Sequence, residues 1–180
     1  DVSNIINKGG TILYSDRCLE FKTPEGMAKA LDTCKKLGID GIVAIGGDGT
    51  FRGATDLSVR GIPCIGLPGT IDNDITATDY TIGYDTAMNT VLELCGRLRD
   101  TSESHARCTV VEVMGRNAGY IALETGIALN AIGIAIQEVN FDKKALFEKM
   151  IAARKDGRRS FIVVVAEGLG SAFAQALTKE

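Results

Sequence analysis

Proline, histidine and closely spaced cysteines are scarce in this sequence of 180 residues. It contains three prolines, one histidine and five cysteines, and no two cysteines are closer than 13 residues. That spacing excludes a CxxC metal or redox motif and favours reduced, mostly buried thiols, as in a cytoplasmic protein. We interpret the single histidine, His105, as a structural or surface residue, with a catalytic role as the alternative.

Long apolar runs and an excess of charge of one sign are also missing. The longest apolar runs, such as residues 161–166, are far shorter than the ~20 residues that span a bilayer. No signal-peptide pattern opens the sequence. With 20 basic and 23 acidic residues, the net charge is -3, which provides no basic surface for non-specific nucleic-acid binding. We therefore expect neither a membrane nor a nucleic acid among the partners.

Glycine, by contrast, is abundant, with 21 residues that stand mainly at the ends of apolar runs. Five of these runs are typical of buried strands that are covered on both faces. They comprise residues 41–45, 62–67, 109–113, 133–136 and 161–165. A 45% hydrophobic composition supplies enough apolar surface for a folded core and excludes disorder as the dominant state.

Helical patterns alternate with these strands. A helix should begin after Thr23-Pro24 and end at Gly38, another should run from about Tyr84 to Arg99, and a third should follow Asp142 and end at residues 156–157. Strand–helix alternation predicts an α/β fold with mostly parallel sheets. The long helix from Tyr84 is a plausible connection between two lobes.

The first expected strand is followed by GGDGT (46–50) and then by a helix expected from Phe51. Glycines let a backbone approach a phosphate closely, and a helix N-terminus offers free N–H groups. Asp48 would repel a bare phosphate but suits a Mg²⁺ ion held beside nucleotide phosphates. The alternative is a tight strand-to-helix turn that requires glycine.

The second expected strand is followed by PGTIDND (68–74). Asp72 and Asp74 are suited to a base and to a metal-binding or positioning role, while Thr70 and Asn73 add neutral hydrogen-bonding groups. The alternative is an Asx-rich capping loop. Because ligands gather at the carboxyl ends of strands in α/β sheets, a Mg-nucleotide and an acceptor hydroxyl would meet at these two loops.

Two later strand ends carry further polar residues. Arg116, in the loop MGRNAG (114–119), could stabilise charge on a transferring phosphoryl group. Glu167, after the strand that ends near Val165, could accept hydrogen bonds from sugar hydroxyls. Together the four strand ends predict a phosphoryl transferase.

Several segments in order resemble the 6-phosphofructokinases of the bacterial ATP-dependent type: GGDGT, PGTIDND, TDYTIGYDTA, RLRDTSESHARCTVVEVMGRNAGYIAL and VVVAEG. PGTIDND together with MGRNAGY is specific, whereas NAD and lipid kinases have a loop similar to GGDGT. The resemblance covers essentially the whole chain. It implies a glycolytic, cytoplasmic and allosteric kinase with a three-layer α/β fold of two Rossmann-like lobes, of which residues 1–83 would be part of the ATP lobe and 84–180 part of the fructose 6-phosphate lobe.

The resemblance also implies roles for matching residues. Asp72 would be the general base for the 1-hydroxyl of fructose 6-phosphate, Asp74 would support it, and Thr70 and Arg116 would contact the transferred group. Residues expected at ATP are Arg17, Cys18, Gly47, Asp48, Gly49 and Thr50, with Asp48 as the Mg²⁺ ligand. Residues expected at the sugar phosphate are Thr70, Ile71, Asp72, Met114, Gly115, Arg116, Glu167 and Arg107, the last reaching across the interface of a homo-oligomer that is a homotetramer in the full-length family.

Two finer expectations follow from the same resemblance. Gly49 and Gly69 indicate ATP as the donor, because relatives that use pyrophosphate carry Asp and Lys at these positions. Arg99 and Arg158 match the family's effector site for ADP or phosphoenolpyruvate, although solvated surface charges are an equal alternative. Ile132 and Asp156 stand where some members have Glu and Lys, so we do not expect ADP activation to be preserved.

The chain is expected to be the catalytic middle of a longer subunit. Nothing like GGDAPG precedes Ile5, and the family's later Arg/His segment does not follow Glu180. The main hypothesis is therefore a kinase that converts ATP and fructose 6-phosphate to ADP and fructose 1,6-bisphosphate. The alternative is an inactive fragment, or a nucleotide- or sugar-phosphate-binding module. PGTIDND and MGRNAGY argue against a third hypothesis, an NAD or lipid kinase.

Overall fold

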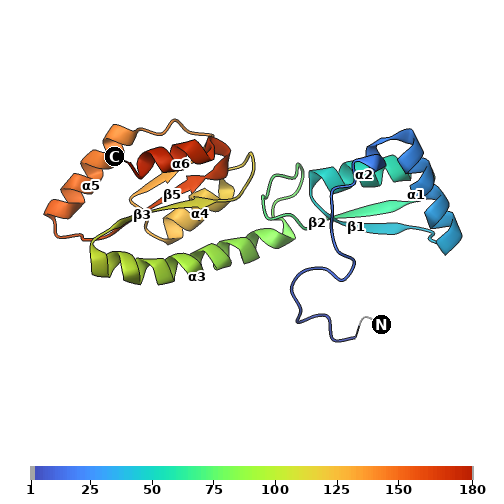
Figure 1. Cartoon of the computed structure of the whole chain (residues 1–180), viewed down its shortest axis with the longest axis horizontal. Helices are drawn as coiled ribbons and strands as arrows, with labels where there is room; N and C mark the ends of the chain where they lie inside the picture. Colours follow the sequence, from blue (N-terminus) through green and yellow to red (C-terminus); the bar gives the residue numbers. More distant parts are fainter. Residues whose placement is uncertain (1–2, 180) are drawn as a thin grey trace. The chain divides into compact units, whose positions relative to one another are not determined.

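The computed structural model describes residues 3–179, and the chain divides into two compact units (Figure 1). The first extends to Ala44 and also contains Gly49–Gly66, while the second contains Ile45–Asp48 and the chain from Leu67 onward. The boundary expected at residues 83 and 84 divides the chain by the ligand that each part is expected to bind, which these units do not test, so it stays a prediction.

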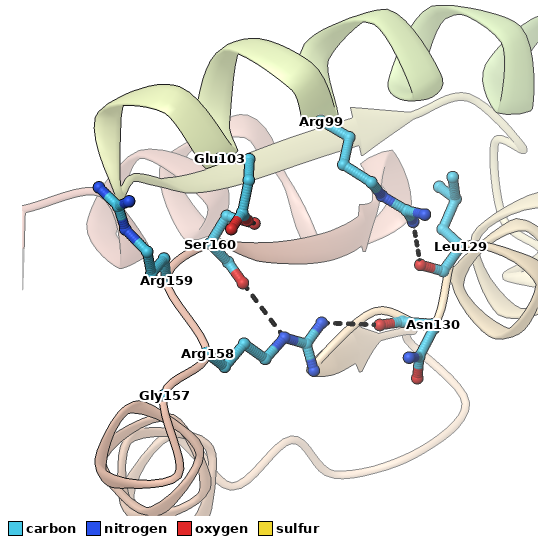
Figure 2. Close-up of a pocket in the computed structure, with 8 residues that line it drawn as sticks. All are labelled: Arg99, Glu103, Leu129, Asn130, Gly157, Arg158, Arg159 and Ser160. Carbon is cyan, nitrogen blue, oxygen red and sulfur yellow. Dashed lines mark hydrogen bonds between the residues drawn. The ribbon is translucent and has the colours of Figure 1, made fainter.

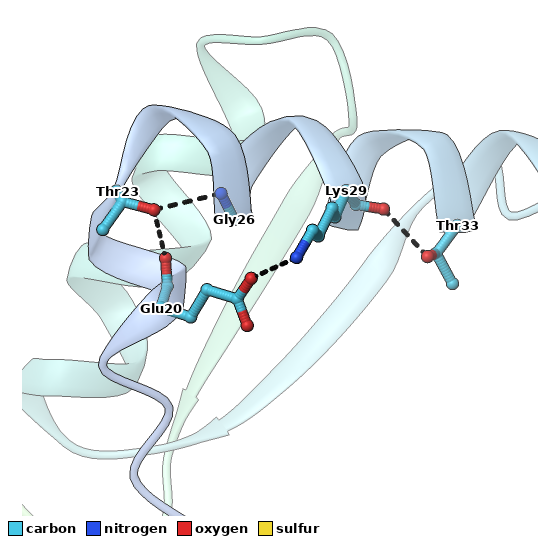
Figure 3. Close-up of polar contacts among 5 residues, drawn as sticks. All are labelled: Glu20, Thr23, Gly26, Lys29 and Thr33. Atoms are coloured by element: carbon cyan, nitrogen blue, oxygen red, sulfur yellow. Dashed lines mark hydrogen bonds and ion pairs between the residues drawn. The ribbon is translucent and has the colours of Figure 1, made fainter.

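The first α-helix of the first unit begins and ends at the residues that its sequence predicts. Helix α1 spans Pro24–Leu37, after a short 3-10 helix η1 at Glu20–Lys22. Thr23 caps it by accepting a hydrogen bond from the Gly26 N–H at 3.1 Å (Figure 3), and Gly38, with φ +63°, ends it in the left-handed conformation. Glu20 pairs with Lys29 one turn into the helix. Local capping chemistry is therefore sufficient to define this element.

A two-stranded sheet joins β1 (Ile42–Gly46) and β2 (Cys64–Pro68), with α2 (Asp48–Ser58) between them in sequence. Side chains from α1, α2 and the sheet pack into one core cluster, which contains Met27, Cys34, Leu57 and Ile62. The opposite face of the sheet is exposed: Val43 is 60% and Ile65 is 66% accessible to solvent. The expectation that these strands are covered on both faces is therefore wrong, because an apolar run specifies strand formation but not what lies on each face.

The second unit contains a parallel sheet in the order β3-β5-β4. Its strands are β3 (Cys108–Val113), β4 (Gly133–Ala135) and β5 (Phe161–Ala166). The central strand β5 places Phe161 opposite Cys108 of β3 and Val163 opposite Gly133 of β4. Both pairings are parallel, which confirms the predicted α/β class with parallel strands.

Helices cover both faces of this sheet (Figure 1). Ile162 and Val164 of β5 face a cluster with α3 (Ile82–His105) and α4 (Tyr120–Ala128). Val163 and Val165 face a second cluster with α5 (Lys143–Lys155) and α6 (Ser171–Leu177), which follows the 3-10 helix η2 (Glu167–Leu169). This period-two alternation gives the second unit the predicted three-layer arrangement.

Two helix boundaries and the cysteine environments differ from expectation. Helix α3 continues to His105 because buried Ser102 shares a hydrogen bond with Thr109 of β3, and α2 begins at Asp48 rather than at residue 51. All five cysteines are free, but Cys18 and Cys108 are exposed, so the expectation of mostly buried thiols is wrong for these two.

The surface position of His105 agrees with the sequence interpretation. The His105 side chain is exposed, and its Nδ1 lies 3.1 Å from the Thr101 carbonyl oxygen at the end of α3. Among residues 3–179, none of the helices is both long and apolar enough to cross a membrane.

Candidate functional site

The loops after β1 and β2 lie side by side in the second unit. The Gly69 N–H donates to the Gly46 carbonyl at 2.9 Å. A Cβ atom added to Gly47 would lie 3.3 Å from Cβ of Thr70, so these two predicted site residues are in close contact. Asp48 follows Gly47 directly and opens α2. The sequence expectation that the glycine loop and the PGTIDND loop occupy neighbouring strand ends is thereby confirmed.

Asp72 is a half-buried carboxylate whose environment disfavours its charged form. Burial raises its pKa most strongly, and the neighbouring Asp74 carboxylate raises it further. A hydrogen bond from Thr70 and the charge of Arg116 lower the pKa, whereas Glu167 adds a further increase. Since charges after β3 and β5 act on a carboxylate after β2, these three loops converge in space.

The loop that carries Asp72 contacts the start of α3 and is hydrogen-bonded to it. Asn73 has a φ of +54°, a conformation that Asn tolerates better than most residues. Its Oδ1 accepts a hydrogen bond from the Thr81 N–H at 2.8 Å. A Cβ atom at Gly83 would lie 2.7 Å from the Gly69 carbonyl oxygen, so only glycine lets the first turn of α3 approach this closely.

Glu167 binds the backbone of the Arg116 loop. Its Oε1 accepts hydrogen bonds from the N–H groups of Gly115 at 3.1 Å and Arg116 at 2.7 Å. Arg116 has a φ of +56°, which is uncommon for a residue with a side chain. A Cβ atom at Gly115 would lie 2.4 Å from the Ala118 carbonyl oxygen. Both of these hydrogen bonds use the same carboxylate oxygen, Oε1.

Two side chains at the end of β4 join this region and were missed by the sequence interpretation. The Glu138 Oε1 accepts a hydrogen bond from the Gly119 N–H at 2.7 Å. The side-chain amide of Gln137 is buried without a hydrogen-bond partner among the described residues, and its Nε2 lies 2.8 Å from the position of a Cβ atom at Gly168. The rule that placed ligands at strand ends also applies to the expected strand 133–136, and would have found both residues.

Arg107 lies at the opposite end of the sheet. It directly precedes β3, and its carbonyl accepts a hydrogen bond from the Phe161 N–H at 3.1 Å. Arg116 and Glu167 follow the carboxyl ends of β3 and β5, and a strand of this length spans roughly 20 Å. The fold of one chain therefore keeps Arg107 away from the other predicted sugar-phosphate residues.

Other predicted residues occupy varied environments. Met114, the first residue of the Arg116 loop, is 61% exposed, whereas Ile71 packs against the core between α3, α4 and β5. Arg17 and Cys18 are exposed in the segment before η1, and the Arg17 N–H donates to Asp16 at 2.6 Å. Gly49 and Thr50 lie in the first turn of α2 and are exposed.

A separate pocket of about 350 Å³ lies before the amino ends of β4 and β5 (Figure 2). Arg99 donates to the Leu129 carbonyl, and Arg158 donates to the Asn130 carbonyl at 3.1 Å. Its lining residues are Arg99, Glu103, Leu129, Asn130, Gly157, Arg158, Arg159 and Ser160. The predicted effector residues Arg99 and Arg158 are thus brought together, with Arg159 as a third cation.

The parallel sheets and the convergence of loops at their carboxyl ends define an α/β protein of the ligand-binding type. The chain belongs to the phosphofructokinase family, whose family model, described as "Phosphofructokinase", matches residues 1–180.

Relatives support the same assignment. An ATP-dependent 6-phosphofructokinase from Bacillus subtilis (strain 168) is 51% identical over 170 residues, covering 94% of this chain and 53% of the relative. ATP-dependent 6-phosphofructokinase 1 from Clostridium perfringens is 54% identical over 169 residues, with coverage of 94% and 53%. The chain therefore spans about half the length of the curated relatives that it matches.

Solved structures have a similar fold. Phosphofructokinase from Saccharomyces cerevisiae matches with a TM-score of 0.84 and 33% identity, covering 94% of this chain and 27% of that one. The Pichia pastoris enzyme in the T-state matches with a TM-score of 0.78 and 36% identity, covering 89% and 19%. A pyrophosphate-dependent phosphofructokinase from Nitrosospira multiformis matches with a TM-score of 0.61 and 26% identity, covering 80% and 40%.

Proposed function

We propose that this chain carries the phosphoryl-transfer site of an ATP-dependent 6-phosphofructokinase. The reaction moves the γ-phosphoryl group of ATP to the 1-hydroxyl of fructose 6-phosphate, giving fructose 1,6-bisphosphate and ADP. The observation that carries this proposal is the convergence of Asp74, Arg116 and Glu167 on the half-buried carboxylate of Asp72. The bacterial relatives, which are named ATP-dependent 6-phosphofructokinase, support the same reaction.

Asp72 is the general base in this proposal. Its carboxylate takes the proton from the 1-hydroxyl, the freed oxygen forms a bond to the γ-phosphorus, and the bond from phosphorus to the bridging oxygen breaks, leaving those electrons on ADP. A raised pKa makes the Asp72 carboxylate a better proton acceptor. Arg116 and Thr70 bind the sugar phosphate and stabilise charge on the transferring group, and Asp74 helps to raise the pKa of Asp72.

Asp48 is the protein ligand for Mg²⁺ in this proposal. Among residues 3–179, no group of three or more His, Cys, Asp or Glu residues forms a metal cage. A single carboxylate suits Mg²⁺, which keeps several waters and binds through one or two carboxylates and substrate phosphates. When bound, Mg²⁺ would neutralise charge on the β- and γ-phosphates. Gly47, Gly49, Thr50, Arg17 and Cys18 remain the proposed ATP contacts.

ATP is the proposed donor because of two glycines. A Cβ atom at Gly49 would meet nothing within 4 Å, whereas one at Gly69 would lie 2.9 Å from Ile45. Open space at position 49 leaves room for a nucleotide phosphate, and an Asp there would repel it. Faster turnover with pyrophosphate than with ATP would contradict this choice.

Arg107 is proposed to complete the sugar-phosphate site of a neighbouring subunit. Its place before β3 keeps it from the site of its own chain, so it could bind the 6-phosphate only in an oligomer. A homotetramer is the proposed assembly, as the family resemblance implies. The Arg99–Arg158 pocket is proposed to bind a phosphorylated effector in the same assembly, since three arginines gather there.

A coupled assay with ATP, Mg²⁺ and fructose 6-phosphate tests the proposal. We expect formation of fructose 1,6-bisphosphate by the chain and its loss in Asp72→Ser, with Asp40→Ser, an exposed residue before β1, as the matched control. A folded chain that binds fructose 6-phosphate but shows no turnover would favour the alternative, a binding module without catalysis. Absence of both binding and turnover would contradict the proposed function.

A further inference from the structure

The loop that carries Arg116, residues 114–119, is held at both ends by carboxylates of residues that follow other strands. Glu167, after β5, accepts the N–H groups of Gly115 and Arg116. Glu138, after β4, accepts the N–H of Gly119 at 2.7 Å. Between the two anchors, the Ala118 N–H donates to the Gly115 carbonyl at 2.9 Å and closes a tight turn. Arg116 therefore projects from a turn that is fixed on both sides.

The contact between Glu138 and Gly119 is tightly packed. Gly119 is the N-cap residue of α4 and has no side chain to cap the helix. A Cβ atom at this position would lie 2.6 Å from Glu138 Oε2 and 2.6 Å from Cβ of Ile136. The carboxylate thus replaces a local cap, and its negative charge lies next to the positive end of the helix dipole.

We propose that Glu138 is a positioning residue for Arg116. By holding Gly119, it fixes the far end of the turn in which Arg116 keeps its positive φ of +56°. Without that anchor the turn can relax, and the guanidinium is no longer pre-organised for an anionic sugar phosphate. The proposal rests on the role of Arg116 in the proposed function, and it adds the end of β4 to the site.

Three variants test this role in the chain. Glu138→Ala removes the acceptor and should weaken binding of fructose 6-phosphate about 10-fold, because small displacements of a positioning group have effects of this order or larger. Binding of ATP should not change. Glu138→Gln keeps a carbonyl acceptor and should restore most of the affinity. Glu148→Ala, an exposed glutamate on α5, is the matched control and should leave both affinities unchanged.

Calorimetric titration with fructose 6-phosphate gives the affinities, and thermal unfolding identifies a variant that has simply lost its fold. The decisive experiment introduces Glu138→Ala into a chain that already carries Arg116→Ala. If Glu138 acts through Arg116, it should cause no further loss of affinity for fructose 6-phosphate in this background. The same 10-fold loss in that background, or equal binding by wild type and Glu138→Ala, would overturn the positioning role alone. A wild-type chain that does not bind the sugar phosphate would overturn the proposed function as well.

Discussion

The carboxylate of Glu167 holds the backbone of Arg116 across 51 residues of sequence, with Oε1 2.7 Å from the Arg116 nitrogen. The same oxygen accepts the Gly115 N–H. Two successive N–H groups thus bind one charged acceptor, an arrangement that stabilises a strained turn. The Glu167 side chain and the backbone of the Arg116 loop are therefore parts of one hydrogen-bonded unit.

Removal of this acceptor is expected to destabilise the chain. Glu167→Ala should lower the free energy of unfolding by about 1–3 kcal/mol, because N–H groups lose a charged partner. Glu167→Gln keeps an oxygen acceptor and should cost less. Denaturant unfolding of both variants measures the difference, and an alanine variant as stable as wild type would contradict the assigned contact.

Asp72→Asn is expected to stabilise the chain near neutral pH. The pKa of Asp72 is raised in the folded chain by burial and then by Asp74, so its protonated form is favoured by folding. That contribution is complete below the unfolded pKa of about 3.9 and is lost as pH rises through the higher folded pKa. Above that range the environment of Asp72 disfavours the carboxylate, and Asn, which carries no charge, removes this penalty.

Thermal unfolding at pH 7 and below the unfolded pKa tests whether Asp72→Asn stabilises the chain. The Asn variant should melt above wild type at pH 7, and the difference should shrink below the unfolded pKa. Asp40→Asn, at an exposed position, controls for the loss of one negative charge. A variant that melts below wild type at pH 7 would show that the carboxylate stabilises the fold.

Two helical glycines should respond in opposite directions to alanine. A Cβ atom at Gly96 of α3 would meet nothing within 4 Å, whereas one at Gly126 of α4 would lie 2.6 Å from Cγ1 of Ile134. Gly96→Ala should stabilise by about 0.5–1 kcal/mol through helix propensity. Gly126→Ala should destabilise by roughly 1–3 kcal/mol through overpacking. Equal effects in denaturant unfolding would contradict the packing of α4 on β4.

Gln137 carries a buried amide without a partner among the described residues. Gln137→Met keeps an unbranched side chain of similar length and removes the polar group. Since a buried unsatisfied polar group costs about 1–3 kcal/mol, the Met variant should raise the melting temperature. A clear decrease would mean that the amide makes hydrogen bonds that stabilise the folded chain.

Much of the fold follows from local sequence signals. Thr23 and Gly38 define both ends of α1 through their capping geometry, and the apolar run at residues 161–166 forms the fully buried strand β5. The exposed face of β1 and β2 could not be predicted, because an apolar run does not reveal what packs on it. The last turn of α3 likewise depends on a tertiary contact of Ser102.

The candidate site was predictable to a similar degree. Strand-end positions pointed to Asp72, Arg116 and Glu167, and the structure brings these three together. The backbone role of Glu167 depends on contacts between distant residues, which no local pattern contains. Glu138 follows the same strand-end rule, so the sequence contains a signal for this residue as well.

The turnover of Asp72→Asn tests the central claim most directly. Asn preserves the size of the side chain but cannot accept the proton from the 1-hydroxyl. We predict that the wild-type chain forms fructose 1,6-bisphosphate and that the variant loses about 10²–10⁴-fold in kcat, while its affinity for fructose 6-phosphate changes less than about threefold, since the fold and Arg116 are retained. A wild-type chain without turnover, or a variant that keeps more than about a tenth of the wild-type kcat, would contradict the account.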